Sequence, residues 1–95
     1  MNLLELLAST EKGVSTKNVL KATASATLIN IKKGAVLKEH QSMTDALLVL
    51  LSGSVAYDEE GRWESLGQPL DFVKIPAHTT HKLTGLDDAV LLLIQ

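Results

Sequence analysis

Residues 34–42 read Gly34-Ala35-Val36-Leu37-Lys38-Glu39-His40-Gln41-Ser42. Gly34 follows two lysines and predicts a turn, and the residues after it have the extended character of a strand. In a strand, His40 and Ser42 point to the same side because they are two residues apart. The apolar run at residues 45–51 fits a buried strand or a short helix by periodicity, but its length and its closure by Ser52-Gly53-Ser54 favour a strand. This stretch therefore predicts two strands, the first of which presents a histidine to one face of a sheet.

The rest of the chain continues the pattern of short strands separated by turns. The sequence Asp58-Glu59-Glu60-Gly61 predicts a hairpin tip with Gly61 at a positive φ, and Pro76 ends the pairing of the segment before it. Roughly eight short strands separated by turn signals are typical of a β-sandwich or barrel. The expected strands lie at residues 19–31, 36–40, 45–51, 55–57, 62–65, 71–75, 81–83 and 89–94.

The first residues have a different pattern. Four leucines, at positions 3, 4, 6 and 7, make one apolar face on a short helix over Asn2–Ala8, and Asn2 is a suitable cap. Ser9 to Lys17 is expected to be a polar connection. At 95 residues the chain is expected to form one domain, with the helix and connection at residues 1–18 and a β-barrel at residues 19–95.

Composition excludes several classes of function. The net charge is −2, without a basic stripe or interleaved aromatic residues, so a nucleic-acid surface is not expected. The absence of cysteine excludes disulfides, zinc ribbons, iron–sulfur ligation and thiol chemistry. The apolar segment Met1–Ala8 contains Glu5 and is too short for a signal-peptide core or a membrane span. We therefore expect a soluble, cytoplasmic protein without a nucleic-acid or membrane partner.

Residues 34–53 resemble the first signature motif of the cupin family. That motif runs glycine, five residues, His-x-His, three or four residues, glutamate, six residues, glycine. Three residues stand at these spacings, namely Gly34, His40 and Gly53. Ser42 stands at the position of the second histidine and Ala46 at that of the glutamate, while Asp45 comes one residue early and so, in a strand, on the opposite face. Two of the family's metal ligands are therefore replaced in this chain.

The sequence around Ile75-Pro76-Ala77-His78-Thr79-Thr80-His81 resembles the second cupin motif. That motif runs glycine, five residues, Pro-x-Gly, two residues, histidine, three residues, asparagine. Pro76 and His81 match it, and the two glycines and the asparagine are replaced by Leu70, His78 and Gly85. The resemblance implies an all-β fold, the conical double-stranded β-helix or jelly-roll barrel of the cupins, with the short N-terminal helix packed on a sheet or on a partner subunit. It also implies a homodimer.

The resemblance places a site inside the barrel. In the family, three histidines and one glutamate bind a divalent transition metal, and here His40 and His81 are the candidate ligands for one Fe, Mn, Ni or Zn ion. The alternatives are that both histidines are neutral and hydrogen-bond a ligand or each other, or that backbone groups satisfy them. His78 is expected on an exposed turn, and it joins the ligands only if that turn is recast. Leu48 and Leu50 share the parity of Ser42, so the expected pocket is lined by His40, Ser42, Leu48, Leu50 and His81.

Other conspicuous residues have simpler interpretations. Trp63 is expected to pack in the core or a dimer interface, and the acidic residues 58–60 to form a polar hairpin tip. Three functions stay open. The first is a small-molecule-binding module with a degenerate metal site. The second is a metal-dependent enzyme of the dioxygenase, isomerase or decarboxylase type. The third is a regulatory or interaction subunit whose pocket is vestigial.

Overall fold

The computed structural model describes the backbone of residues 13–21, 24–40 and 43–95, and the side chains of these residues except 17–21, 39 and 40. The helix expected at Asn2–Ala8 and the pocket residue Ser42 lie outside the described residues. Within them the chain forms strands and no helix. The strands are β1 (Val14–Lys21), β2 (Ser25–Ile31), β3 (Val36–His40), β4 (Ala46–Ser52), β5 (Val55–Glu59), β6 (Arg62–Leu66), β7 (Phe72–Ile75), β8 (His81–Gly85) and β9 (Ala89–Ile94).

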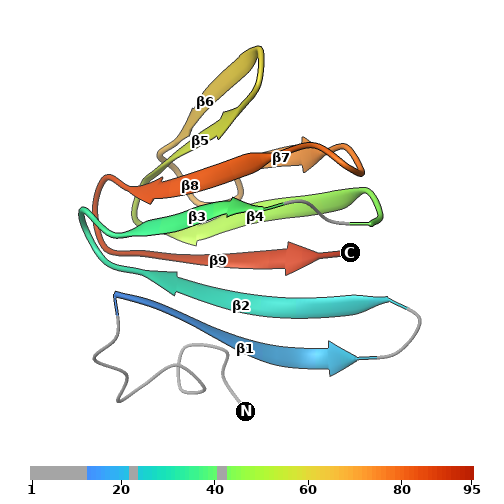
Figure 1. Ribbon diagram of the computed structural model, residues 1–95. Helices are drawn as coiled ribbons and strands as arrows, with labels where there is room; N and C mark the ends of the chain where they lie inside the picture. The colour runs from blue at the N-terminus through green and yellow to red at the C-terminus, as the bar shows by residue number, and fades with distance from the viewer. Residues whose placement is uncertain (1–12, 22–23, 41–42) are drawn as a thin grey trace.

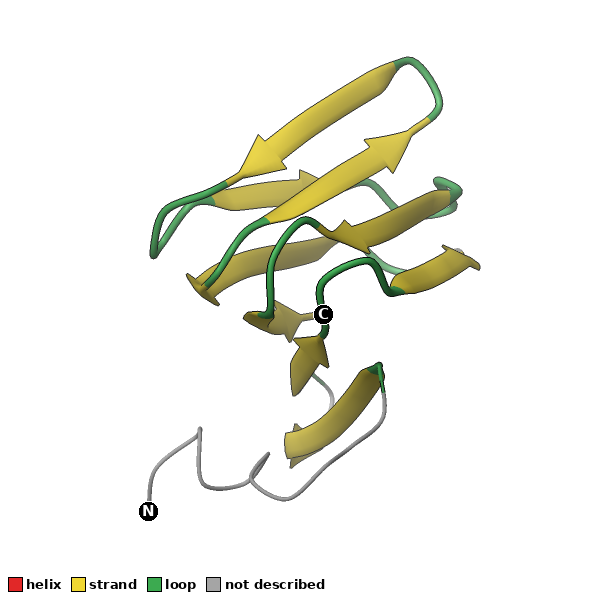
Figure 2. Cartoon of the chain, turned by 90° about the vertical axis from the view of Figure 1, so that its left-hand side faces the viewer, coloured by secondary structure: helices red, strands yellow, loops and turns green. Residues whose placement is uncertain are grey.

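The strands form two sheets, and every strand pairing in them is antiparallel. The five-stranded sheet has the order β1-β2-β9-β4-β7, and the four-stranded sheet has the order β3-β8-β5-β6. Figure 1 shows β9 running between β2 and β4, and the β5–β6 hairpin rising above the other strands. The same hairpin stands at the top of the turned view (Figure 2). The all-β class expected from the sequence is confirmed.

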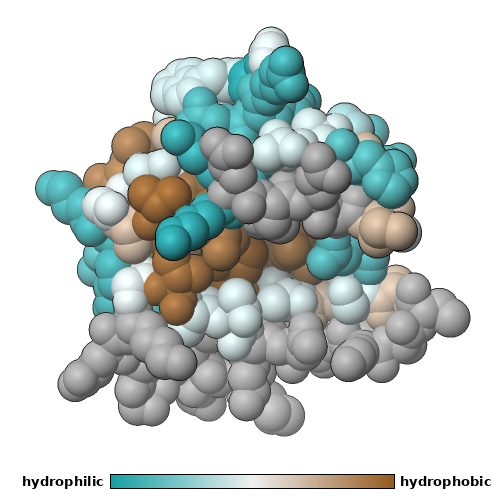
Figure 3. Space-filling view, viewed as in Figure 1, coloured by the Kyte–Doolittle hydropathy of each residue, from teal (hydrophilic) through white to brown (hydrophobic). Residues whose placement is uncertain are grey.

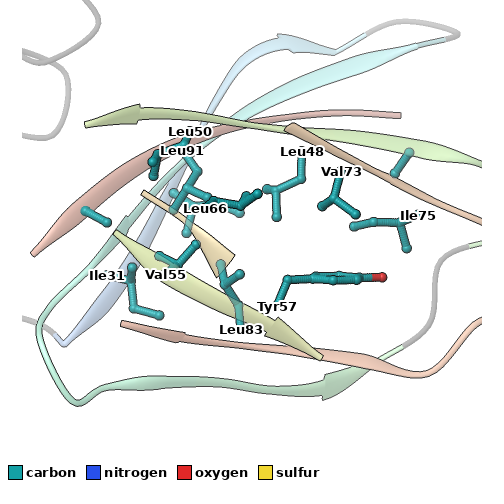
Figure 4. Close-up of a cluster of buried hydrophobic side chains, with 13 residues drawn as sticks. Ile31, Leu48, Leu50, Val55, Tyr57, Leu66, Val73, Ile75, Leu83 and Leu91 are labelled. Carbon is teal, nitrogen blue, oxygen red and sulfur yellow. The ribbon is translucent and has the colours of Figure 1, made fainter. Parts of the chain in front are cut away.

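The core fills the space between the two sheets. Alternate residues of β4, namely Ala46, Leu48 and Leu50, are buried, and the residues between them are half-buried. This period of two is that of a strand with one face on a core, which confirms the strand interpretation of residues 45–51. Figure 4 shows these side chains meeting aliphatic residues of the facing strands, with the ring of Tyr57 at one end of the cluster. Tyr57 is the largest of the fully buried side chains.

Five of the described residues have a positive φ, and four of them stand at cupin motif positions, namely Gly34, Gly53, Leu70 and His78. Gly61 has a φ of 81°, as expected for the hairpin tip, and Gly53 has a φ of 84°. Among the described residues, the two non-glycine residues with positive φ are Leu70 at 76° and His78 at 61°. These are the two positions at which the second cupin motif has glycine. Since glycine is the residue that adopts this conformation without strain, the backbone keeps the motif's geometry after its glycines have been replaced.

Two boundaries differ from the expectation. The single strand expected at residues 19–31 is wrong, because β1 ends at Lys21 and β2 begins at Ser25, and the two strands pair as an antiparallel hairpin. The polar connection predicted at Ser9–Lys17 is wrong in its last residues, because β1 begins at Val14. Val14 pairs with Ile31 and Thr16 with Ile29, so these residues form the start of an edge strand on β2. An edge strand needs one hydrogen-bonded neighbour and tolerates polar side chains on its solvent face. For this reason the composition of β1 resembles that of a loop.

The surface of the molecule is mixed in character. Figure 3 shows hydrophobic residues reaching the surface in the middle of one face, with hydrophilic residues around them. In the part of the chain that the structure describes, no helix is long and apolar enough to cross a membrane. Trp63 is 60% exposed on β6, so the expectation that it packs in the core of this chain is wrong.

Candidate functional site

A row of ionisable residues crosses the four-stranded sheet at the level of the β5–β6 hairpin tip. Arg62 of β6 pairs with Glu59 of β5, Glu59 pairs with His81 of β8, and His81 pairs with His40 of β3. Residues that stand opposite each other in antiparallel strands lie close enough for their side chains to interact. The register thus brings one arginine, one glutamate and two histidines to one level of the sheet. For His40, the structure describes the backbone but not the side chain.

His81 is the buried centre of this row. His81 is 6% exposed, and its Nδ1 lies 2.9 Å from the carbonyl oxygen of Thr79. Because a carbonyl only accepts, Nδ1 carries the proton, and in the neutral ring Nε2 then carries the lone pair. The imidazole also lies against the ring of Tyr57, with the ring centroids 5.8 Å apart and the planes tilted by 31°. The ring is therefore fixed in both orientation and tautomer.

Glu59 forms a charged cluster with its neighbours Tyr57 and Arg62. The Tyr57 hydroxyl donates to Glu59 Oε2 at 2.8 Å, and Arg62 Nε forms an ion pair with Glu59 Oε1. The Glu59 side chain is 8% exposed, whereas that of Arg62 is 37% exposed. The Arg62 guanidinium lies 5.5 Å from the centroid of the Tyr57 ring, within range of a cation–π contact. Burial and the hydrogen bond to Glu59 raise the pKa of Tyr57 to about 12, so the phenol stays protonated.

Arg62 also joins the two sheets. Its Nη2 donates to the carbonyl oxygen of Lys74 in β7 at 2.6 Å, and β7 is an edge strand of the five-stranded sheet. A guanidinium has five donors in a fixed plane, so one side chain can bind a carboxylate and a carbonyl together. Arg62 therefore holds the hairpin against the opposite sheet beside the mouth of the barrel.

Two hollows border His81. The first is a cavity of about 20 Å³ inside the barrel, lined by Ile29, Leu37, Leu48, Tyr57, Ile75, His81, Leu83 and Leu93. A single water needs about 10–15 Å³, so this cavity holds about one water and no larger ligand. The second is an open hollow of about 220 Å³, lined by Asp58, Glu59, Glu60, Thr80, His81 and Lys82. Of these two hollows, the second has the size and polarity for a small polar molecule.

The structure brings together some of the residues predicted to form the pocket. Leu48 and His81 line the inner cavity, whereas Leu50 is fully buried in the core and is not part of its lining. His40 stands opposite His81 in the register of β3 and β8, which are neighbouring strands of the four-stranded sheet. His78 is exposed at the turn after Pro76, in line with the loop position expected for it.

Asp45 has a structural role. Its Oδ1 accepts a hydrogen bond from the backbone N–H of Ala77 at 2.9 Å, which ties the start of β4 to the turn after Pro76. The carboxylate therefore does not replace the missing glutamate of the first motif. Asp45 lies just before β4, which begins at Ala46, and it is exposed.

Sequence reasoning missed Tyr57, Glu59 and Arg62. The sequence predicts Glu59 in a polar hairpin tip, yet it is the last residue of β5 and its side chain is largely buried. The signal in the sequence was the spacing of Tyr57 and Glu59, because residues two apart in a strand share a face. What the sequence lacks is the register that sets Glu59 opposite both Arg62 and His81.

The described residues do not match the metal site of the cupin family. They include no group of three or more His, Asp or Glu side chains that could hold a metal ion. Glu59 is the carboxylate beside His81, but its Oε2 accepts a hydrogen bond from Tyr57 and its Oε1 forms an ion pair with Arg62. A tightly held transition metal normally has three protein ligands, so this arrangement does not fit one.

The fold is found in solved structures. The chain is similar over its full length to a cupin superfamily protein from Desulfitobacterium hafniense, with 22% identity, a TM-score of 0.88 and 87% of that chain covered. It is similar to KdgF from Halomonas sp., with 27% identity, a TM-score of 0.76, and 88% of this chain and 81% of that one covered. With the DMSP lyase DddQ from Ruegeria pomeroyi it shares 19% identity and a TM-score of 0.80, over 92% of this chain and 48% of that one.

Comparisons of the amino-acid sequence find no match. No protein-family model matches the chain, and no curated protein matches it. The structural similarity, together with the two antiparallel sheets, confirms the fold predicted from the two motifs. The chain has the jelly-roll fold of a small cupin domain.

Proposed function

We propose that this protein is a small-molecule-binding module that takes its ligand at the mouth of the barrel, beside His81. The observation that carries the proposal is the position of this histidine between the inner cavity and the open hollow, with its tautomer fixed by Thr79. A buried imidazole of known orientation is a hydrogen-bonding group of the kind that fixes a small ligand in a concave site.

The chemistry of the open hollow suggests the type of ligand. Its lining combines carboxylates, a hydroxyl, an imidazole and one ammonium group. Such a lining offers both donors and acceptors of hydrogen bonds, so it suits a polar molecule with hydroxyl or amino groups better than a hydrocarbon. The inner cavity of about 20 Å³ is too small for such a molecule, so the proposal assigns the ligand to the open hollow.

A metal-dependent enzyme receives less support. It would need a third ligand beside His40 and His81, and the nearest carboxylate on their row is held by an arginine and a tyrosine. The likeness to KdgF and to a lyase supports the shared fold and leaves the chemistry of this chain open.

The test is a ligand screen read out at His81. The ¹⁵N-labelled protein would be titrated with small polyols, sugar acids and amines, and the side-chain signals of its histidines followed by NMR. We expect a ligand to shift the His81 signals, and His81→Gln to weaken its binding at least about tenfold, since a buried polar contact is lost.

The matched control is His78→Asn, which changes the exposed histidine of the same turn. Asparagine tolerates the positive φ found at this position. Equal binding by the wild type and both variants would refute a site at His81.

A further inference from the structure

We propose that the outer face of the five-stranded sheet binds a short apolar peptide with free ends, whose ammonium and carboxylate groups meet Asp45 and Lys74. The site is an open hollow of about 670 Å³ bordered by the ends of β4, β7 and β9. Small-molecule sites have volumes of about 300–1,000 Å³. The hollow shares no lining residue with the open hollow beside His81, so the inference does not depend on the proposed ligand at the barrel mouth.

The floor of this hollow is apolar although it faces away from the core. Leu47 of β4 pairs with Ile94 of β9 on one side and with Lys74 of β7 on the other. These residues lie on the outer face, because the positions that alternate with them, such as Leu48 and Ile75, are the buried ones. The solvent face of an antiparallel sheet usually carries polar side chains. Leu47 and the 39% exposed Ile94 therefore indicate that this face contacts an apolar group.

Two opposite charges border the apolar floor. Asp45 and Lys74 are both exposed, and among the described residues neither belongs to an ion pair. Asp45 comes two residues before Leu47, which is the register partner of Lys74, so the two charged residues lie roughly 7 Å apart along the strand direction. The hydrogen bond from the Ala77 N–H to Asp45 Oδ1 holds the carboxylate in place and leaves Oδ2 for a ligand. Opposite charges that do not neutralise each other favour a ligand that carries both charges and an apolar body.

A dipeptide with apolar side chains has this arrangement of groups. Two residues in extended conformation span about 7 Å, with the ammonium at one end and the carboxylate at the other. The ammonium would meet Asp45 and the carboxylate Lys74, while the apolar side chains cover Leu47 and Ile94. A single amino acid holds the same two charges closer together, and a fatty acid has no ammonium group.

The test uses leucyl-leucine and two analogues that each lack one charge. The ¹⁵N-labelled protein would be titrated with each peptide, the backbone signals of Leu47 and Ile94 followed by NMR, and the affinities measured by calorimetry. We expect leucyl-leucine to shift both signals. N-acetyl-leucyl-leucine lacks the ammonium and leucyl-leucine amide lacks the carboxylate, so each should bind about threefold to fivefold more weakly, as expected for the loss of one exposed ion pair.

Two variants assign each charge to its partner. Asp45→Asn keeps an acceptor for the Ala77 N–H, and it should weaken the binding of leucyl-leucine about threefold to fivefold while leaving that of N-acetyl-leucyl-leucine unchanged. Lys74→Met should likewise weaken the binding of leucyl-leucine and leave that of the amide unchanged. The matched control is Lys33→Met, which removes an exposed charge from the turn between β2 and β3 and should alter neither affinity.

The peptide analogues are tested on the wild type, so the proposal stays falsifiable if Asp45→Asn does not fold, as judged by circular dichroism. Equal affinities for the three peptides, or unchanged signals of Leu47 and Ile94, would overturn it. A dimeric wild type that Leu47→Asp converts to monomers would also overturn it, because a second copy would then cover the hollow. His81→Gln should bind leucyl-leucine as the wild type does, so this site and the site at the barrel mouth can fail separately.

Discussion

The close approach of Gly53 to the β8–β9 turn makes a quantitative prediction. A Cβ atom on Gly53 would lie less than 3.0 Å from the carbonyl oxygen of Asp88 and 2.7 Å from the Cα of Ala89. Gly53 also has a φ of 84°. The substitution Gly53→Ala therefore introduces both an unfavourable backbone conformation and a clash with atoms that are themselves backbone.

Gly61 separates these two effects. Its φ is 81°, but a Cβ there would meet no atom within 4 Å. The left-handed conformation costs an alanine about 1–2 kcal/mol, and the smaller entropy lost by alanine on folding returns about 0.5–1 kcal/mol. Gly61→Ala should therefore lower the free energy of unfolding by about 0.5–1 kcal/mol. Gly53→Ala adds overpacking of about 1–3 kcal/mol and should be clearly the more destabilising variant.

Urea unfolding followed by circular dichroism measures the difference. Gly85→Ala gives the clash without the unusual φ, because its Cβ would lie less than 3.0 Å from the carbonyl oxygen of Lys32. We expect Gly85→Ala to fall nearer to Gly53→Ala than to Gly61→Ala. If Gly53→Ala and Gly61→Ala unfold at the same urea concentration, the turn at Gly53 does not approach the β8–β9 turn as described.

Three other predictions follow from single side chains. The pKa of Tyr57 is raised from 10.0 to about 12, so on raising the pH the unfolded state loses this proton before the folded state does. The contribution of Tyr57 to stability should be complete below pH 10 and fall by about 2–3 kcal/mol as the pH approaches 12. Tyr57→Phe should remove this pH dependence, and a variant that keeps the same pH dependence would contradict the assignment. Trp63 is 60% exposed, so acrylamide should quench its fluorescence almost as well as in the unfolded chain, and strong protection would instead place it in an interface. The homodimer remains a prediction, and Phe72, which is 55% exposed on the five-stranded sheet, is its expected contact. Phe72→Asp should then give monomers in light scattering, and a monomeric wild type would refute the dimer.

The fold could be predicted because its signals are local. Gly61 and Gly53 mark turns, and the alternation in β4 marks a strand with one buried face, so neighbouring residues carry the information. These local signals do not specify which strands pair, so the register of β3 and β8, which sets His40 opposite His81, is known only from the structure.

The Arg62 cluster could not be predicted because its signals are not local. The sequence places Glu59 near a hairpin tip, where an acidic side chain is usually solvated. Its burial depends on Tyr57 below it, on Arg62 across the hairpin and on the position of β7 in the opposite sheet. No spacing within one strand encodes a contact among three strands of two sheets, so only the structure reveals that this carboxylate faces inward.

The place of β9 in the five-stranded sheet has a consequence for how the chain folds. β2 and β4 each pair with β9 and not with each other, although β9 follows both of them in the chain. Until β9 is added, the β1–β2 hairpin and the β4–β7 pair have no common neighbour, so this sheet closes only through contacts between distant parts of the chain. Such closure is intrinsically slow because the loop entropy is lost before the contacts form. Before β9 is added, the edges of β2 and β4 that later pair with it are unpaired, and unpaired strand edges make a folding intermediate prone to aggregation.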